Sequence, residues 1–192
     1  MQIKKEIIIN GAGLVGSLLA IYLAKRGHAV KIYERRTDMR LSGAAAGRSI
    51  NLALSDRGIK ALEKVGIAGD LKKISIPMHG RQIHNSNGTE AFQPYGAEGQ
   101  FINSVSRGEL NMRLTDLAEK NGIEIFFNER CEKIDWRKNE VTYINENSGK
   151  AHAAKADLIF GADGACSASR LQHQFKSDMF EYQQTYNHCS YK

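Results

Sequence analysis

The sequence predicts an α/β fold that opens with a strand–helix–strand unit, and three features near its start carry that prediction. Residues 7–9 form a short β-branched run, which is typical of a buried strand. A glycine-rich turn follows, and apolar side chains then recur at helical spacing until Gly27, a residue type that favours a helix end. Residues 30–34 resume a strand pattern. These pieces fit within about 30 residues, the usual size of one parallel βαβ unit.

The glycine-rich turn reads Gly11-x-Gly13-x-x-Gly16. The first glycine permits a sharp strand-to-helix turn, the second lets the backbone approach a diphosphate, and the third lets the helix pack on the strand. The diphosphate would lie at the helix N-terminus, where free N–H groups favour negative charge. Glu34 ends the second strand, where its carboxylate can accept hydrogen bonds from ribose hydroxyls but would repel a 2′-phosphate. The turn predicts a Rossmann-like site for FAD or NAD rather than NADP. A glycine turn in an unrelated α/β protein is the alternative.

The rest of the chain mixes helical and β-rich segments. Helices are predicted at residues 55–65 and 68–74, and a capping box at residues 106–109 predicts a third. Strands are predicted on both sides of the turn at Asn87-Gly88 and at residues 101–105, 123–127, 131–136, 141–144 and 157–160. We expect a loop over the glycine- and alanine-rich residues 42–47, and a further strand in the tail from residue 179.

Composition places the protein among ordinary globular chains, with 42% hydrophobic and 25% charged residues. The net charge of +6 is spread among acidic residues rather than gathered into a basic tract, so nucleic acid is not a predicted partner. The longest apolar stretch, residues 14–24, is too short to span a bilayer. The three cysteines, Cys131, Cys166 and Cys189, show no disulfide or metal-ligand spacing. We therefore expect a cytoplasmic protein with no membrane segment and no metal site.

A second motif separates a flavoprotein from a simple dehydrogenase. The strand at residues 157–160 leads into Asp163-Gly164-x-x-Ser167-x-x-Arg170, and residues 78–150 are β-rich. A plain NAD dehydrogenase would instead continue with similar βα units and has no task for this motif. With the first glycine motif, the chain resembles aromatic-ring flavin hydroxylases of the p-hydroxybenzoate hydroxylase type. It is also similar to the kynurenine 3-monooxygenase family in residues 48–55, 76–78, 94–96, 104–107 and 180–184.

This resemblance implies a Rossmann-like FAD/NAD(P)-binding fold of the glutathione-reductase type, with the start of an interleaved β-rich substrate domain. It implies FAD as cofactor, NADPH as co-substrate, and O2-dependent hydroxylation of L-kynurenine to 3-hydroxy-L-kynurenine. The implied division is an FAD-binding unit at 1–77, substrate-domain strands at 78–100, the FAD-binding domain continued at 101–175, and the start of a substrate-domain sheet at 176–192.

The resemblance also assigns roles to residues. The implied FAD contacts are Gly11, Gly13, Val15, Gly16, Tyr33, Glu34, Arg35, Arg36, Ala53, Arg107, Cys131, Asp163 and Gly164. Val15 and the stretch from Tyr33 would line the adenosine end. Arg107 would approach the phosphates; as an ordinary exposed arginine in a first helical turn it would oppose the helix dipole. Cys131 would act through its backbone, which leaves its thiol a buried and inert group.

Arg81 and Tyr95 match the family positions that bind the substrate carboxylate, a task that suits a guanidinium and a phenol. Read without the family, Arg81 is a solvated charge on a strand and Tyr95 a loop residue. No catalytic acid or base is predicted, because the flavin does the chemistry and the substrate's own aniline nitrogen activates the ring.

In this family a later strand that ends in Gly-Asp also contacts FAD, and no counterpart precedes Lys192. We therefore expect an N-terminal portion that binds FAD weakly and has poor or no activity alone. Two alternatives stay open. One is another flavoprotein of the same fold, such as a halogenase or an alkene reductase of the geranylgeranyl type. The other is a non-catalytic dinucleotide-binding fragment.

Overall fold

The computed structural model describes residues 3–41 and 51–174, and at their centre lies a parallel sheet. The sheet has four strands in the order β12-β1-β2-β8, all parallel to their neighbours. The strands are β1 (Glu6–Asn10), β2 (Ala29–Glu34), β8 (Glu124–Phe127) and β12 (Leu158–Gly161). Central parallel strands are covered on both faces. This explains why residues 7–10 are all buried.

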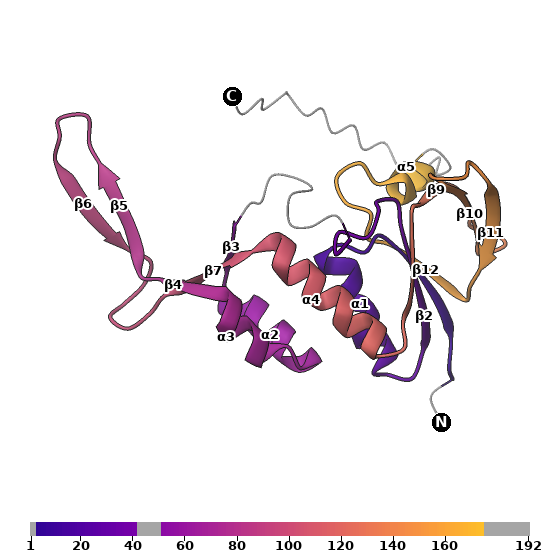
Figure 1. Ribbon diagram of the computed structural model, residues 1–192, viewed down its shortest axis with the longest axis horizontal. Helices are drawn as coiled ribbons and strands as arrows, with labels where there is room; N and C mark the ends of the chain where they lie inside the picture. Colours follow the sequence, from indigo (N-terminus) through magenta and orange to yellow (C-terminus); the bar gives the residue numbers. More distant parts are fainter. Residues whose placement is uncertain (1–2, 42–50, 175–192) are drawn as a thin grey trace.

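Two helices cover one face of this sheet (Figure 1). Helices α1 (Leu14–Ala24) and α4 (Arg107–Lys120) contact each other there. Side chains alternate along a strand, so Ile7 and Ile9 of β1 point into this helical layer. They join Ile21, Ile32 and Leu114 in the larger of two apolar clusters.

A second, antiparallel sheet covers the opposite face. Its order is β11-β10-β9, from β9 (Glu129–Asp135), β10 (Glu140–Asn145) and β11 (Ala151–Lys155). Ile8 points to this side and packs with Tyr33 and Tyr143 in the smaller cluster. Helix α5 (Ala168–Gln174) contacts β9 at the end of this layer. The unit thus has helices, a parallel sheet and an antiparallel sheet as three successive layers.

Of the remaining elements, two helices pack against α1 and α4, and a small sheet and a hairpin then extend away from the three layers, as Figure 1 shows. Helices α2 (Asp56–Val65) and α3 (Ala68–Ile74) lead into a sheet of order β3-β7-β4. Its strands are β3 (Asn51–Leu54), β4 (Ser75–Met78) and β7 (Ile102–Ser106). Beyond it projects a two-stranded hairpin of β5 (Gly80–His84) and β6 (Glu90–Pro94). None of the helices in the described ranges is long and apolar enough to cross a membrane.

The predicted α/β fold is confirmed, and so are the helices and strands predicted within the described ranges. Three strands were not predicted: β3, β4 and β11. Pro77 in β4 argues against a strand, and the structure resolves the conflict by placing β4 at a sheet edge. The loop at 42–47 and the tail strand lie outside the described residues, and the domain division stays a prediction.

Arg40 ties the segment after β2 to helix α4. Its guanidinium donates to Asp38 at 2.6 Å, to Asp116 at 2.8 Å and to Glu119 at 2.6 Å. The hydrogen bond from Arg40 lowers the pKa of Asp38, since it stabilises the ionised carboxylate. A lowered carboxyl pKa adds stability above the ordinary pKa of the group, and this stability is lost as the pH falls through the lowered value.

We predict that Arg40→Gln lowers the free energy of unfolding at pH 7 by about 1–2 kcal/mol, because charged hydrogen bonds to partly exposed carboxylates are lost. The deficit should shrink as the pH falls below about 4, because Asp38 is protonated first in the unfolded chain and only at its lowered pKa in the folded, unchanged protein. Urea denaturation at pH 7 and pH 3 measures it. Equal deficits at the two pH values would contradict the assignment.

Candidate functional site

The carboxyl ends of three parallel strands meet at one edge of the central sheet. The glycine loop follows β1, Glu34 ends β2, and a second loop follows β12. Backbone hydrogen bonds join them: Gly11 N donates to Tyr33 O at 2.7 Å, and Ala162 N donates to Asn10 O at 2.8 Å. This edge is where parallel α/β sheets bind their ligands.

The three glycines of the loop differ in what an added side chain would meet. Gly11 has φ +105°, and a Cβ there would lie 2.6 Å from the carbonyl oxygen of Ala162. A Cβ on Gly16 would lie 1.9 Å from the carbonyl oxygen of Gly11. Both are therefore required by the packing of the chain itself. A Cβ on Gly13 would meet nothing within 4 Å, so that glycine faces open space.

The helix that follows presents an uncapped amide end at this loop. Gly13 is the N-cap of α1, no side chain caps it, and the first turn carries no acidic residue. Val15 in that turn is 70% exposed. The first N–H groups of a helix have no intrahelical acceptor, and the helix dipole adds positive potential at this end. The loop therefore suits a bound anion such as a diphosphate.

The carboxylate of Glu34 lies against the same loop. Its Oε2 accepts from Ala12 N at 2.8 Å and its Oε1 accepts from Arg36 N at 2.9 Å. Each carboxylate oxygen has two acceptor positions, so one on each remains for an outside donor. The two amides thus fix the carboxylate beside the loop, with capacity left for a pair of hydroxyls.

A polar cleft adjoins the end of β2. It has a volume of about 510 Å³, and its lining includes Arg35, Arg36 and Arg130. Arg130 is itself paired with Glu132 and Glu146. The side chains of Arg35 and Arg36 make no hydrogen bond or ion pair with any described residue, which leaves both guanidinium groups free to face a ligand in this cleft.

The Asp163 motif forms a hydrogen-bonded turn that opens α5. The carboxylate of Asp163 accepts from Ser167 Oγ at 2.6 Å and from Ser169 N at 3.0 Å. Ser167 Oγ accepts in turn from Arg170 N at 2.9 Å. Gly164 has φ +81°, in the left-handed region that favours glycine. The motif thus shapes the loop that packs against Gly11.

Two residues expected at the adenosine end are buried in the core. The ring of Tyr33 stacks between Phe126 and Tyr143, with centroid distances of 4.8 and 3.9 Å. Its ring therefore cannot line the loop, and only its backbone can contribute. Cys131 is buried, and burial raises the pKa of its thiol to about 12. That thiol is protonated at neutral pH.

Ala53 lies in the sheet next to the three layers, and Arg107 lies where β7 of that sheet leads into α4. Ala53 is exposed in β3 and pairs with Ser104 of β7. Arg107 is exposed in the first turn of α4, whose N-cap Ser106 accepts from Glu109 N at 3.4 Å. Among the described residues, no hydrogen bond or ion pair joins either side chain to the glycine loop, and both assignments stay predictions.

Arg81 lies in β5 of the projecting hairpin, and Tyr95 directly follows its second strand, β6. Arg81 pairs with Gln93, and Tyr95 N donates to His79 O at 3.0 Å, so both side chains belong to one face of the hairpin. Arg81 Nε also donates to Gln93 Oε1 at 2.7 Å. This face is far from the glycine loop in the described part of the chain (Figure 1).

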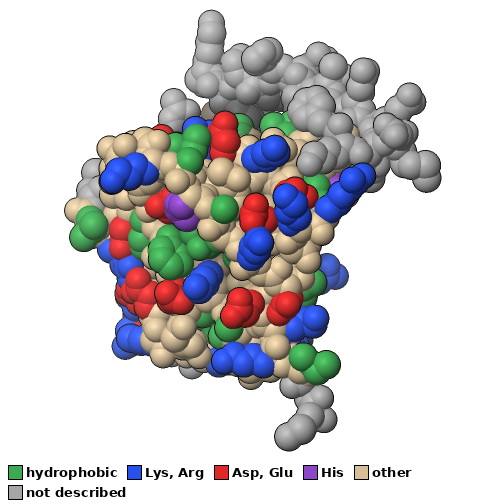
Figure 2. Space-filling view, turned by 90° about the vertical axis from the view of Figure 1, so that its right-hand side faces the viewer, with side chains coloured by type: hydrophobic (Ala, Val, Ile, Leu, Met, Phe, Trp, Pro, Cys, Tyr) green, Lys and Arg blue, Asp and Glu red, His purple; other side chains and the backbone are tan. Residues whose placement is uncertain are grey.

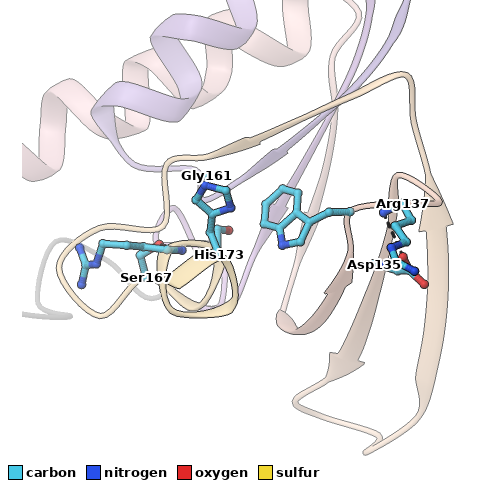
Figure 3. Close-up of a pocket in the computed structure, with 8 residues that line it drawn as sticks. Asp135, Arg137, Gly161, Ser167 and His173 are labelled. Carbon is cyan, nitrogen blue, oxygen red and sulfur yellow. Dashed lines mark hydrogen bonds between the residues drawn. The ribbon is translucent and has the colours of Figure 1, made fainter. Parts of the chain in front are cut away.

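Sequence reasoning missed a second pocket of about 920 Å³ between α5 and the turn after β9. Trp136 and His173 line it and pack edge to face, with centroids 5.6 Å apart. Asp135 and Arg137 lie at the end of the pocket away from Ser167 and His173 (Figure 3). The Asp163 motif supplies Ser167 and Arg170 to this pocket, but the opposite wall, with Trp136, comes from a separate element that no motif marks.

The surface over the antiparallel sheet gives no sign of a nucleic-acid interface. Figure 2 shows Lys and Arg side chains interspersed with Asp and Glu on this face rather than gathered into one patch. Mixed charges of this kind do not create the extended positive potential that binds a phosphate backbone.

Comparison with known families decides the class of the site. The profile described as "FAD binding domain" matches residues 4–189. The chain belongs to this family of FAD-binding domains. FAD, the cofactor predicted from the sequence, is thereby confirmed.

Curated relatives refine the comparison. The chain is 43% identical over 187 residues to a kynurenine 3-monooxygenase of Myxococcus xanthus, covering 96% of this chain and 40% of that protein. It is 43% identical to the enzyme of the same name from Flavobacterium johnsoniae, covering 100% and 42%. The relative from Anopheles gambiae is 42% identical, covering 94% and 37%. The chain therefore spans about 40% of the length of the curated relatives it matches, and the predicted resemblance is confirmed.

Solved structures confirm the fold of this FAD-binding domain. The flavin-dependent monooxygenase PieE, in complex with FAD and substrate, superposes with a TM-score of 0.76 at 18% identity, covering 90% of this chain and 32% of that one. 2-Methyl-3-hydroxypyridine-5-carboxylic acid oxygenase superposes with a TM-score of 0.73 at 23% identity, covering 90% of this chain and 43% of that one. The halogenase CndH superposes with a TM-score of 0.67 at 20% identity, covering 85% of this chain and 38% of that one.

We predict that Gly13→Ala weakens FAD binding without unfolding this FAD-binding domain. The added Cβ meets no protein atom and should change the unfolding free energy by no more than about 1 kcal/mol. It would occupy the space of the diphosphate and raise the Kd for FAD at least about tenfold. Flavin fluorescence titration and urea denaturation measure the two quantities.

The matched control is Gly11→Ala, whose Cβ would meet the Ala162 backbone at a positive φ. It should lose about 2–4 kcal/mol of stability. If Gly13→Ala binds FAD as tightly as the unchanged chain, the diphosphate does not lie at Gly13.

We predict that Cys131 resists alkylation in the folded chain. With a pKa of about 12, only on the order of one thiol in ten thousand is ionised at pH 8, and the group is buried. Cys166 is exposed and should react with iodoacetamide first. Mass spectrometry before and after unfolding in urea maps both sites. Early labelling of Cys131 would refute the burial assigned to it.

Proposed function

We propose that this chain supplies the ADP-binding part of the FAD site in a flavin-dependent hydroxylase that converts L-kynurenine to 3-hydroxy-L-kynurenine with NADPH and O2. The observation that carries the proposal is the uncapped amide end of α1 beside the fixed carboxylate of Glu34. Its substrate rests on the similarity to relatives named kynurenine 3-monooxygenase along nearly the whole chain.

In this proposal each part of the site contacts one part of FAD. The amide end of α1 holds the diphosphate, next to Gly13. The carboxylate of Glu34 accepts from the ribose hydroxyls, and Arg35 and Arg36 face the adenosine end from the polar cleft. Arg107 approaches the phosphates, as the family resemblance implies. Asp163 and Gly164 act by shaping the loop beside Gly11.

FAD, when bound, supplies the chemistry, accepting a hydride from NADPH and using O2 to hydroxylate the substrate ring. The chain itself orients the cofactor and binds the substrate. Arg81 and Tyr95 present a guanidinium and a phenol on one hairpin face, a combination that suits the amino-acid carboxylate of L-kynurenine. No side chain is assigned a catalytic proton transfer, because the substrate's aniline nitrogen already activates the ring.

The charge of Glu34 also discriminates between FAD and NADPH, the two nucleotides of the proposed reaction. The negative charge of Glu34 beside the glycine loop would repel the 2′-phosphate of NADPH. NADPH therefore acts as a co-substrate at another place and does not compete for this loop. A cytoplasmic location, expected from the scattered cysteines, stays a prediction.

We predict that Arg81→Met in the complete gene product raises the KM for L-kynurenine about tenfold or more while kcat changes less, because a charged hydrogen bond to the carboxylate is lost. The assay follows NADPH oxidation and identifies 3-hydroxy-L-kynurenine by mass spectrometry. The matched control is Arg137→Met, which removes an arginine outside the hairpin.

A substrate analogue that lacks the carboxylate makes the test specific. For this analogue Arg81→Met and the unchanged protein should have the same KM. If Arg81→Met affects both substrates equally, Arg81 does not bind the carboxylate. If the unchanged protein binds FAD but never forms the hydroxylated product, the substrate assignment is wrong while the cofactor site stands.

A further inference from the structure

A buried polar side chain lies directly before the glycine loop. Asn10 is the last residue of β1, only 1% exposed, and it follows three buried isoleucines. Its Oδ1 accepts from Tyr143 Oη at 2.5 Å. Its Nδ2 donates to Ser169 Oγ at 3.0 Å and lies 3.8 Å from Cys131 Sγ. The single amide is thus bonded to β10, α5 and β9, and its orientation is fixed by its partners.

Tyr143 contacts two residues that are bonded to the start of the loop. Its hydroxyl donates to Asn10, and its ring stacks on Tyr33 at 3.9 Å with an interplanar angle of 9°. Tyr33 O accepts from Gly11 N at 2.7 Å. Tyr143 is fully buried, and burial raises its pKa, so the hydroxyl stays protonated and keeps donating. It therefore holds the residue before Gly11 and also the residue that accepts the hydrogen bond of Gly11.

The same network reaches the Asp163 turn. Ser169, whose hydroxyl accepts from Asn10, donates its backbone N–H to Asp163 Oδ2 at 3.0 Å. A Cβ on Gly161 would lie 2.7 Å from Ser169 Cβ, so helix α5 packs tightly on the end of β12. The two loops at the sheet edge therefore share one hydrogen-bonded chain that runs from Tyr143 through Asn10 and Ser169 to Asp163.

We propose that Tyr143 and Asn10 are positioning residues for FAD, which hold the glycine loop in the conformation that presents the amide end of α1. The proposal rests on the FAD site described above, and neither side chain would touch the cofactor. An apolar residue at position 10 would continue the run of isoleucines and fill the core without any need for partners. A satisfied polar network at this one place instead fixes a single arrangement of the loop.

The test compares two tyrosine-to-phenylalanine variants of the 192-residue chain. Tyr143→Phe removes only the hydroxyl bonded to Asn10. The control, Tyr22→Phe, removes a hydroxyl that donates to Ala61 O at 2.8 Å and links α1 to α2. Flavin fluorescence gives the Kd for FAD, urea denaturation gives stability, and hydrogen exchange of the FAD-free chain gives the protection of the amides in residues 11–16.

For Tyr143→Phe we expect the Kd to rise about tenfold, the order of effect when a buried acceptor loses its partner, and loop amides to exchange faster. For Tyr22→Phe we expect a similar loss of stability with the Kd and loop protection within about twofold of the unchanged chain. A purely structural role for Tyr143 would make the two variants alike in all three measurements, and that result would overturn the proposal.

A second variant tests whether the pair acts as a unit. Asn10→Leu removes the amide, and the double variant Asn10→Leu with Tyr143→Phe should bind FAD as Asn10→Leu does, since no partner is left for the hydroxyl. If the two substitutions instead weaken FAD binding additively, Asn10 and Tyr143 do not act as a pair. If the unchanged chain fails to bind FAD, the proposed function and this inference both fall. If it binds FAD and Tyr143→Phe matches Tyr22→Phe, only this inference falls.

Discussion

Close packing around the glycine loop sets the path of the chain from β1 into α1. A side chain on Gly11 would collide with the loop after β12, and a side chain on Gly16 would collide with the carbonyl of Gly11. This packing turns the chain sharply from β1 into α1 and leaves the amide end of the helix facing outward. An anion site follows from the backbone path, before any charged side chain contributes.

The layers on both sides of the parallel sheet maintain that path. Isoleucines of β1 alternate between the helical layer and the antiparallel layer, so the strand before the loop is held from both faces. Tyr33 belongs to the antiparallel side, where its ring supports the core while its carbonyl accepts from Gly11. Glu34, the next residue, places its carboxylate against the loop. The end of β2 thus contributes to the core through Tyr33 and to the candidate site through Glu34.

The local parts of the site could be predicted from the sequence, because spacing along the chain determines them. The three glycines and the Ser106 cap lie within single strand–helix junctions, and Glu34 ends the strand of the same βαβ unit as the glycines. Long-range pairings could not be predicted: the Tyr143–Asn10 hydrogen bond joins residues 133 positions apart. The ring of Tyr33 and the pocket at Trp136 were missed for the same reason. Strand β11, rich in alanine, lacks the apolar alternation that marks a strand.

NMR titration of the ¹⁵N-labelled chain with ADP shows residue by residue whether the amide end of α1 binds the diphosphate of FAD. We expect the amide signals of residues 13–16 to shift with ADP and to shift much less with adenosine, which carries no diphosphate. Shifts of equal size with both ligands, or shifts confined to residues away from the glycine loop, would show that the diphosphate does not bind there.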